Sequence, residues 1–155
     1  MTRPLMTVMT LIAVAISISA CASSGVPAPA TLAMGQEACR SCRMAIGSAR
    51  TAAQIVAANE EPLFFDDIGC LRDYLHEHRV ASPGAAVYVA DRRTGAWIPA
   101  TTATYVLEAG QDTPMGSHLF AYADPAAAHD LSGSQSRRMK ADELFRGIEL
   151  PGGGR

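Results

Sequence analysis

The sequence predicts an α+β fold in which two small ββαβ-type halves in tandem pack as one compact unit, after a flexible lipoprotein tether. Three observations predict this fold. An apolar run near the N-terminus ends in a cysteine, short apolar segments alternate with turn residues, and the order of the predicted elements recurs in the second part of the chain. A chain of 155 residues has room for one modest core, or for two small halves that share one.

Residues 1–20 have the features of a bacterial signal peptide. Arg3 precedes an apolar run over residues 5–18, which is too short to span a bilayer comfortably but suits a signal-peptide core. The run ends in Ile18-Ser19-Ala20-Cys21, which resembles a lipobox, so we expect Cys21 to carry the lipid and to begin the mature protein. Two or three acyl chains would anchor the protein stably. An ordinary secretory peptide with an incidental cysteine is the alternative.

Residues 21–37 are expected to form the lipidated cysteine and its tether. Residues 22–37 are rich in Pro, Ala, Ser and Gly without apolar periodicity, which predicts an extended, mobile spacer. Ala22 stands where an aspartate is associated with inner-membrane retention, so we expect a periplasm-facing anchor in the outer membrane. Loss of Arg3 with the signal peptide changes the formal charge from −2 to −3. No basic patch is left for nucleic acid.

The first half is expected over residues 38–95. Its strand signals are short runs of β-branched and aromatic residues bounded by turn residues. We expect strands at 51–58, 62–65 and 86–90. Between the last two, Asp66 or Asp67 stands where an N-cap belongs, and apolar residues recur at helical spacing from Ile68 as far as Arg79. The predicted order is therefore ββαβ, with the helix packed on the hairpin.

The second half is expected over residues 96–150 and repeats this order. We expect strands within 96–107, at 118–123 and at 143–148. Asp124 and Pro125 occupy the cap and first position of a predicted short helix, so Tyr122-Ala123-Asp124 matches Phe65-Asp66-Asp67 of the first half. Residues 151–155, which are mostly glycine, are expected to be a flexible tail.

The residues that carry chemistry are sulfur ligands gathered in a few places. They are Cys39, Cys42 and Met44 in one segment, Cys70 in the predicted helix, and Met115 close to His118 before a strand. Cu(I) prefers soft thiolate and thioether ligands. A thioether needs no deprotonation and cannot be lost to a disulfide in an oxidising compartment. This mixture predicts a Cu(I) site, and zinc is the alternative because three Cys and one His could supply four donors.

Other uses of the three mature thiols stay open. A disulfide from Cys39 or Cys42 to Cys70 would staple a non-metal structural lipoprotein that scaffolds a membrane complex. A C-x-x-C pair also occurs in thiol oxidoreductases, although here it follows a polar tether instead of a strand. Asp66 and Asp67 are first of all helix-start residues, with a role as a harder, secondary ligand as the alternative. No Ser/His/Asp arrangement or phosphate-binding glycine loop is visible, so we expect no catalytic residues.

Several of these motifs together resemble the NosL family, the lipoproteins that accompany nitrous oxide reductase maturation. Besides the lipobox, the matching pieces are Cys42-Arg43-Met44, the segment FFDDIGCL at 64–71, and the segment TPMGSH at 113–118. The resemblance covers nearly the whole mature domain. It implies two ββαβ halves, binding of Cu(I) outside the cytoplasm and its delivery toward nitrous oxide reductase, with a membrane transporter complex as a possible further partner.

Carried over residue by residue, the resemblance implies Cys42, Met44 and Met115 as the principal ligands. The additional candidates are Cys39, Cys70 and His118. The family element usually has glycine between Cys and Met, whereas here Arg43 puts a cation beside the metal. We therefore expect a membrane-tethered Cu(I) chaperone, a carrier and not an enzyme. A shell of two or three sulfurs would let a partner's ligand attack before the protein releases the ion.

Overall fold

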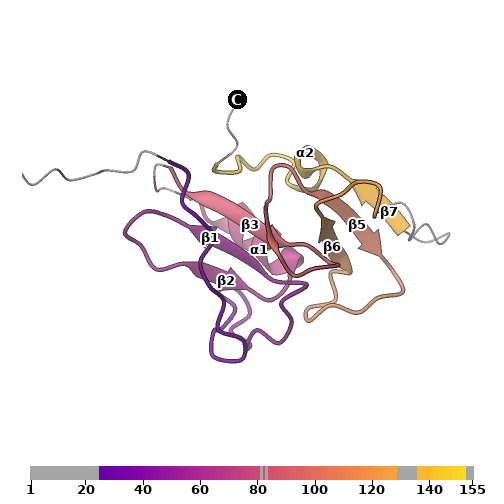
Figure 1. The fold of residues 1–155 in the computed structure, drawn as a ribbon, viewed down its shortest axis with the longest axis horizontal. Helices are drawn as coiled ribbons and strands as arrows, with labels where there is room; N and C mark the ends of the chain where they lie inside the picture. The colour runs from indigo at the N-terminus through magenta and orange to yellow at the C-terminus, as the bar shows by residue number, and fades with distance from the viewer. Residues whose placement is uncertain (1–24, 81, 83, 129–135, 153–155) are drawn as a thin grey trace, which may run out of the picture.

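Two small antiparallel sheets and two helices make up the described part of the chain, residues 25–80, 82, 84–128 and 136–152 of a computed structural model (Figure 1). The α+β class is confirmed. The first sheet has the order β2-β1-β3-β4, with β1 Ala53–Val56, β2 Leu63–Phe65, β3 Ala86–Ala90 and β4 Trp97–Pro99. The second has the order β6-β5-β7, with β5 Thr104–Glu108, β6 Leu119–Tyr122 and β7 Ser136–Met139. The helices are α1 Ile68–Glu77 and α2 Ala141–Leu144.

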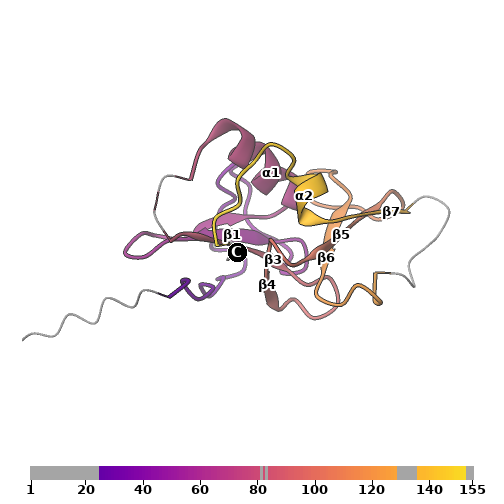
Figure 2. The same ribbon diagram turned by 90° about the horizontal axis from the view of Figure 1, so that it is seen from above.

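Helix α1 follows β2 directly because Asp67 caps it. The Asp67 side chain accepts a hydrogen bond from the Gly69 backbone N–H at 2.7 Å, which satisfies one of the unpaired donors of the first turn. One side of the helix buries Ile68, Leu71 and Leu75. These side chains share one core with both sheets, and Figure 2 shows α1 and α2 on the same side of the sheets. The predicted hairpin, helix and third strand of the first half are confirmed.

The two sheets repeat one strand order. In β2-β1-β3 and in β6-β5-β7, the first strand of the three lies in the centre and its two successors pair with it in antiparallel fashion. This arrangement is the one expected of two related halves. Strand β4, expected as the start of the second half, instead pairs with β3 and extends the first sheet. The division of residues 38–150 into halves at 95/96 stays a prediction.

The end of the second half differs from the prediction. Residues 125–128 form turns, with Asp124 accepting from the Ala126 N–H, and the rest of the predicted helix lies outside the described residues. The predicted strand at 143–148 is wrong, because α2 begins at Ala141 and the third strand of the sheet is β7. Strand β7 consists of Ser-Arg-Arg-Met, which has one apolar residue and so gives no alternation signal. Leu144, Phe145 and Ile148 pack on the core from a helical turn and the segment after it.

The predicted mobile spacer at 22–37 is wrong from Pro27 onward, because this segment packs on the first sheet. The buried Gln54 side chain holds Ala30 by two hydrogen bonds, accepting from its N–H at 2.8 Å and donating to its C=O at 3.2 Å. Tyr88 Oη donates to the Pro27 C=O at 2.5 Å, and Leu32 packs on the cluster formed by Ile46, Ala52 and Phe64. Figure 2 shows this indigo segment on the side of the sheet opposite α1. The sheet is therefore covered on both faces.

The other end of the chain is also packed as far as it is described. Gly152 has φ +80°, and a Cβ there would lie 3.2 Å from the Cα of Ala86, so Gly152 of the predicted tail lies against the first sheet. Residues 153–155, like Cys21, lie outside the described residues. No helix in the described ranges has the length and apolarity needed to cross a membrane.

Candidate metal centre

Cys39 and Cys42 lie in a tight loop that backbone hydrogen bonds close. The Cys39 N–H donates to the Met44 C=O at 2.8 Å, and the Arg43 N–H donates to the Cys39 C=O at 3.0 Å. Arg43 turns the chain with a left-handed backbone, φ +67°. The Arg40 N–H donates to the C=O of Phe64 in β2 at 2.7 Å. The loop is therefore attached to the strand that leads into α1.

This attachment brings the loop to the carboxylate and the thiol that follow β2. Asp66 stands between β2 and α1, and Cys70 lies in the first turn of α1. One ligand atom from each of Cys39, Cys42, Asp66 and Cys70 lies within 4.8 Å of all the others. An ion bound tetrahedrally at about 2.3 Å would need ligand atoms roughly 3.8 Å apart, so small side-chain adjustments would close the site on one metal ion. We call these four residues the cysteine cluster.

The four residues of the cysteine cluster differ in their exposure to solvent. Cys39, Asp66 and Cys70 are buried, whereas Cys42 is partly exposed. The Cys42 thiol donates to the Asp66 carboxylate, with Sγ 3.5 Å from Oδ1. All three cysteines are free thiols. The cluster thus offers one accessible sulfur and three shielded ligand atoms.

The surroundings of Cys42 and Cys70 favour the protonated form of these two thiols. Burial, followed by the neighbouring Cys39 thiol, raises the pKa of Cys70 far above its ordinary value. Burial also raises the pKa of Cys42, with further contributions from Cys39 and the negative charge of Asp66. A thiol must lose its proton to bind a metal, and a bound cation supplies the positive charge that the cluster lacks. The donor set therefore fits a soft metal cation.

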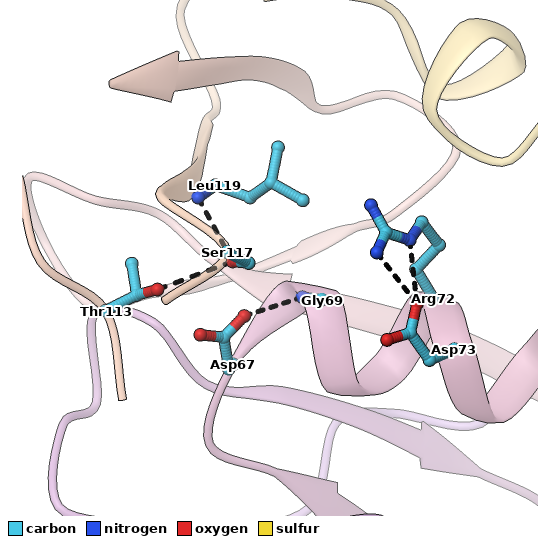
Figure 3. Close-up of polar contacts among 7 residues, drawn as sticks. All are labelled: Asp67, Gly69, Arg72, Asp73, Thr113, Ser117 and Leu119. Atoms are coloured by element: carbon cyan, nitrogen blue, oxygen red, sulfur yellow. Dashed lines mark hydrogen bonds and ion pairs between the residues drawn. The ribbon is translucent and has the colours of Figure 1, made fainter. Parts of the chain in front are cut away.

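Asp67 is not part of the cluster and instead holds a second loop. Its Oδ2 accepts from the Met115 N–H at 3.0 Å, while Oδ1 accepts from Gly69. Burial alone would raise the pKa of Asp67, but hydrogen bonds from Ser117, Thr113 and the two backbone N–H groups outweigh it and hold the pKa below its usual value. Figure 3 shows Thr113 and Ser117 beside Asp67 at the start of α1. The loop between β5 and β6 thus meets the first turn of α1.

The other predicted ligands lie outside the cysteine cluster. Met44 and Met115 are exposed, at 52% and 48% of their surface. Each is tied by its backbone to a residue in or beside the cluster, Met44 to Cys39 and Met115 to Asp67. His118 Nδ1 lies 2.7 Å from the Gln111 C=O, so that ring nitrogen already has a partner. The structure therefore unites three predicted cysteines and places the two methionines at the surface.

Asp66 is the cluster member that the sequence indicated least clearly. A carboxylate before a helix usually caps it, and both Asp66 and Asp67 fit that description. The structure gives the cap to Asp67 and the cluster position to Asp66. The backbone of the folded chain separates the two residues. Asp67 has extended backbone angles, φ −144° and ψ 138°, so the side chains of consecutive residues there point to opposite sides.

The comparisons with known proteins agree with this architecture. The family model NosL matches residues 29–141. Among solved structures, the crystal structure of the copper chaperone NosL from Shewanella denitrificans is 18% identical, covers 77% of this chain and 98% of its own, and has a TM-score of 0.63. That likeness shows a shared fold. The comparison with curated proteins finds no match. Because the family model spans most of its length, the chain belongs to the NosL family.

Proposed function

We propose that this protein is a Cu(I) chaperone, a carrier without enzymatic activity, that binds its cargo at the cysteine cluster. The observation that carries the proposal is the convergence of three free thiols and one carboxylate on a single point. Membership of the NosL family supports it, as does the similar solved structure, which is titled a copper chaperone. The cargo ion is a substrate that the protein takes up and gives away.

Copper(I) is the proposed cargo because the ligands are soft. Thiolates bind Cu(I) strongly, and thioethers bind it while Zn(II) rarely takes them. Three thiolates with a carboxylate would also suit Zn(II), so the methionines at the rim favour copper. Met44 and Met115 are exposed and are each joined to the cluster region through a backbone hydrogen bond. Their thioethers are available to an ion that enters or leaves.

Transfer is proposed to begin at Cys42. It is the partly exposed thiol of the cluster, whereas Cys39 and Cys70 are buried. A partner's sulfur can attack the ion from this side while the buried ligands still hold it. A fully enclosed shell would make a structural metal site instead of a carrier.

The compartment and the client are also part of the proposal. The lipobox supports export and a lipid anchor at Cys21 on a periplasm-facing membrane, with Ala22 favouring the outer membrane. The family resemblance supports nitrous oxide reductase as the copper enzyme supplied, and a membrane transporter complex as a second partner. The residues that pack on the sheet begin at Pro27, six residues after Cys21 in the sequence.

The test is an anaerobic Cu(I) titration of reduced residues 22–155 against a competing chelator. We expect one tightly bound ion per chain. Cys42→Ser should weaken binding by more than about 100-fold, since the loss of a residue that merely supports a ligand costs about 10–100-fold. Ser41→Ala, the exposed neighbour, is the matched control and should change nothing. A folded protein that fails to compete for Cu(I), or competes equally well without Cys42, would overturn the proposal.

A further inference from the structure

Asp67 is a buried carboxylate outside the cysteine cluster, and each of its two oxygens accepts a backbone hydrogen bond. Oδ1 accepts from the Gly69 N–H at 2.7 Å and Oδ2 accepts from the Met115 N–H at 3.0 Å. The hydroxyls of Thr113 and Ser117 lie 3.4 Å from each other in the same loop as Met115. A helix cap requires only the first of the two Asp67 bonds. The second joins α1 to a loop 48 residues further along the chain.

That loop sits directly on the first turn of α1. A Cβ built on Gly69 would lie 2.6 Å from the Cβ of Ser117, a separation that real side chains essentially never show. Glycine at this position is therefore what lets the loop approach. Within the loop, the Gly116 N–H donates to the Thr113 C=O at 3.0 Å and the His118 N–H donates to Thr113 Oγ1 at 3.1 Å. The loop is held in one shape and in one place.

Asp66 and Asp67 thus have different tasks on opposite sides of one extended turn. Asp66 joins the three thiols, and Asp67 binds the backbone of Met115. Cys70, the thiol in the first turn of α1, follows closely in sequence. The same helix start therefore fixes one thiol, one carboxylate and the Met115 backbone relative to one another.

We propose that Asp67 is a positioning residue of the copper site, which holds Met115 at the start of α1 so that its thioether can bind the ion carried by the cysteine cluster. The inference rests on the proposed Cu(I) function and adds to it a supporting residue and a route by which the second half of the chain reaches the metal. Residues that orient metal ligands act through those ligands. The effect of Asp67 on copper should therefore depend on the presence of Met115.

A double-mutant cycle with Asp67→Asn and Met115→Ala tests this dependence. Asparagine is a good N-cap, but its single acceptor oxygen cannot serve Oδ1 and Oδ2 partners in the same way. Each single variant should bind Cu(I) about 10–100-fold more weakly in the chelator competition. The double variant should bind Cu(I) no more weakly than the single variant with the lower affinity. Copper K-edge X-ray absorption should count one sulfur fewer around Cu(I) in both singles.

Additive losses, or unchanged affinity in either single variant, would overturn the inference. Additivity would mean that Asp67 acts through its charge and not through Met115. Failure of the unsubstituted protein to bind Cu(I) would instead overturn the proposed function. The two failures are therefore distinguishable. Urea unfolding of each variant establishes that it is folded under the titration conditions.

Gly69→Ala tests the same contact without a change of charge. In a helix this substitution ordinarily stabilises the protein, but here the added Cβ must displace Ser117 and the loop. We expect Cu(I) affinity to fall at least about tenfold, as for loss of a ligand's support, and Met115→Ala to add nothing to that loss. The matched control is Gly110→Ala in the same β5–β6 connection, where a Cβ meets nothing within 4 Å. Unchanged affinity in folded Gly69→Ala would contradict the proposal.

Discussion

At the level of single residues, Arg43 has a side chain that its backbone conformation disfavours. Its φ of +67° lies in the left-handed region, which favours glycine, and the turn it makes lets Cys39 and Met44 pair across the loop. A non-glycine residue in this conformation costs roughly 1–2 kcal/mol. The turn thus explains why the family element usually has glycine at this position. In this chain, Arg43 adopts the same turn with a strained backbone.

Arg43→Gly should therefore stabilise the protein by about 1 kcal/mol, measured as the free energy of unfolding in urea. Arg43→Ala is the matched control, because it removes the same charge but keeps a Cβ. We expect the alanine variant to be no more stable than the unsubstituted protein. Equal stabilisation by alanine and glycine would show that the charge, and not the backbone, is what the glycine relieves.

The individual cluster residues could be predicted to different extents. Cys39 and Cys42 are close in sequence, so their proximity follows from the chain itself. Cys70 joins them because Arg40 binds to Phe64 in β2, a long-range backbone contact that no local pattern encodes. Asp66 was indistinguishable from a cap until the backbone assigned that role to Asp67. Residue types predicted the chemistry, and tertiary contacts decided which residues share the site.

Among the elements, the N-terminal segment has the most unexpected role. Residues 27–37 look like a spacer because their Pro, Ala and Gly content has no periodicity, yet they cover the outer face of the first sheet. The sequence feature that indicates this packing is Gln54, a polar residue in an otherwise apolar strand. Its side chain is fully buried and satisfies both backbone groups of Ala30.

Gln54→Ala should lower the free energy of unfolding by about 1–3 kcal/mol, because it leaves the Ala30 N–H and C=O without partners. The measurement is urea unfolding of residues 22–155. The matched control is Gln36→Ala, since Gln36 is exposed in the same segment that Gln54 anchors. A loss in Gln54→Ala no larger than in the control would mean that residues 25–37 contribute nothing to stability.

The regular elements of the first half were predictable because each carries a local signal. Strand β3 is a continuous run of apolar and aromatic residues, and α1 has a cap and helical spacing. The partner of β4 is decided by tertiary packing, which pairs this strand with β3. Strand β7 carries no strand signal because its residues are mainly polar, and α2 is too short to show helical spacing. Local patterns thus identify elements better than they identify their partners.

At the scale of the whole molecule, Asp91 joins the two sheets. Its Oδ1 accepts from the Arg93 and Thr94 N–H groups after β3, and its Oδ2 accepts from the Ala123 N–H after β6 at 2.8 Å. Asp91 also forms an isolated parallel bridge with Ala121 in β6. Burial alone would raise the pKa of Asp91, but these hydrogen bonds outweigh burial and lower it.

Asp91→Asn should destabilise the fold by about 1–3 kcal/mol at pH 7. Because the pKa of Asp91 is lower in the folded chain than the usual value of about 3.9, its stabilising effect is present above that pH and is lost as the pH falls through the folded pKa. The difference in unfolding free energy between the two proteins should therefore shrink below about pH 4. Asp112→Asn, at an exposed aspartate, is the control. A difference that stays constant with pH would contradict this role.

The proposed binding of the ion by Met115 would make the metal centre depend on both sheets. The cysteine cluster comes from the first half, and the loop held by Asp67 connects β5 to β6 in the second sheet. The two sheets share one core, which includes Phe65 and Leu71 from the first half and Tyr105 and Phe145 from the second. Relative displacement of the sheets would therefore alter the distance between the thiols and Met115.

The central claim is that copper binds at the cysteine cluster, and a crystal structure of the Cu(I)-loaded protein tests it most directly. Anomalous diffraction measured on both sides of the copper absorption edge locates the ion without assumptions about its ligands. We predict a copper peak within bonding distance of the thiols of Cys39, Cys42 and Cys70. A copper peak elsewhere, with the three thiols free of metal, would contradict the account.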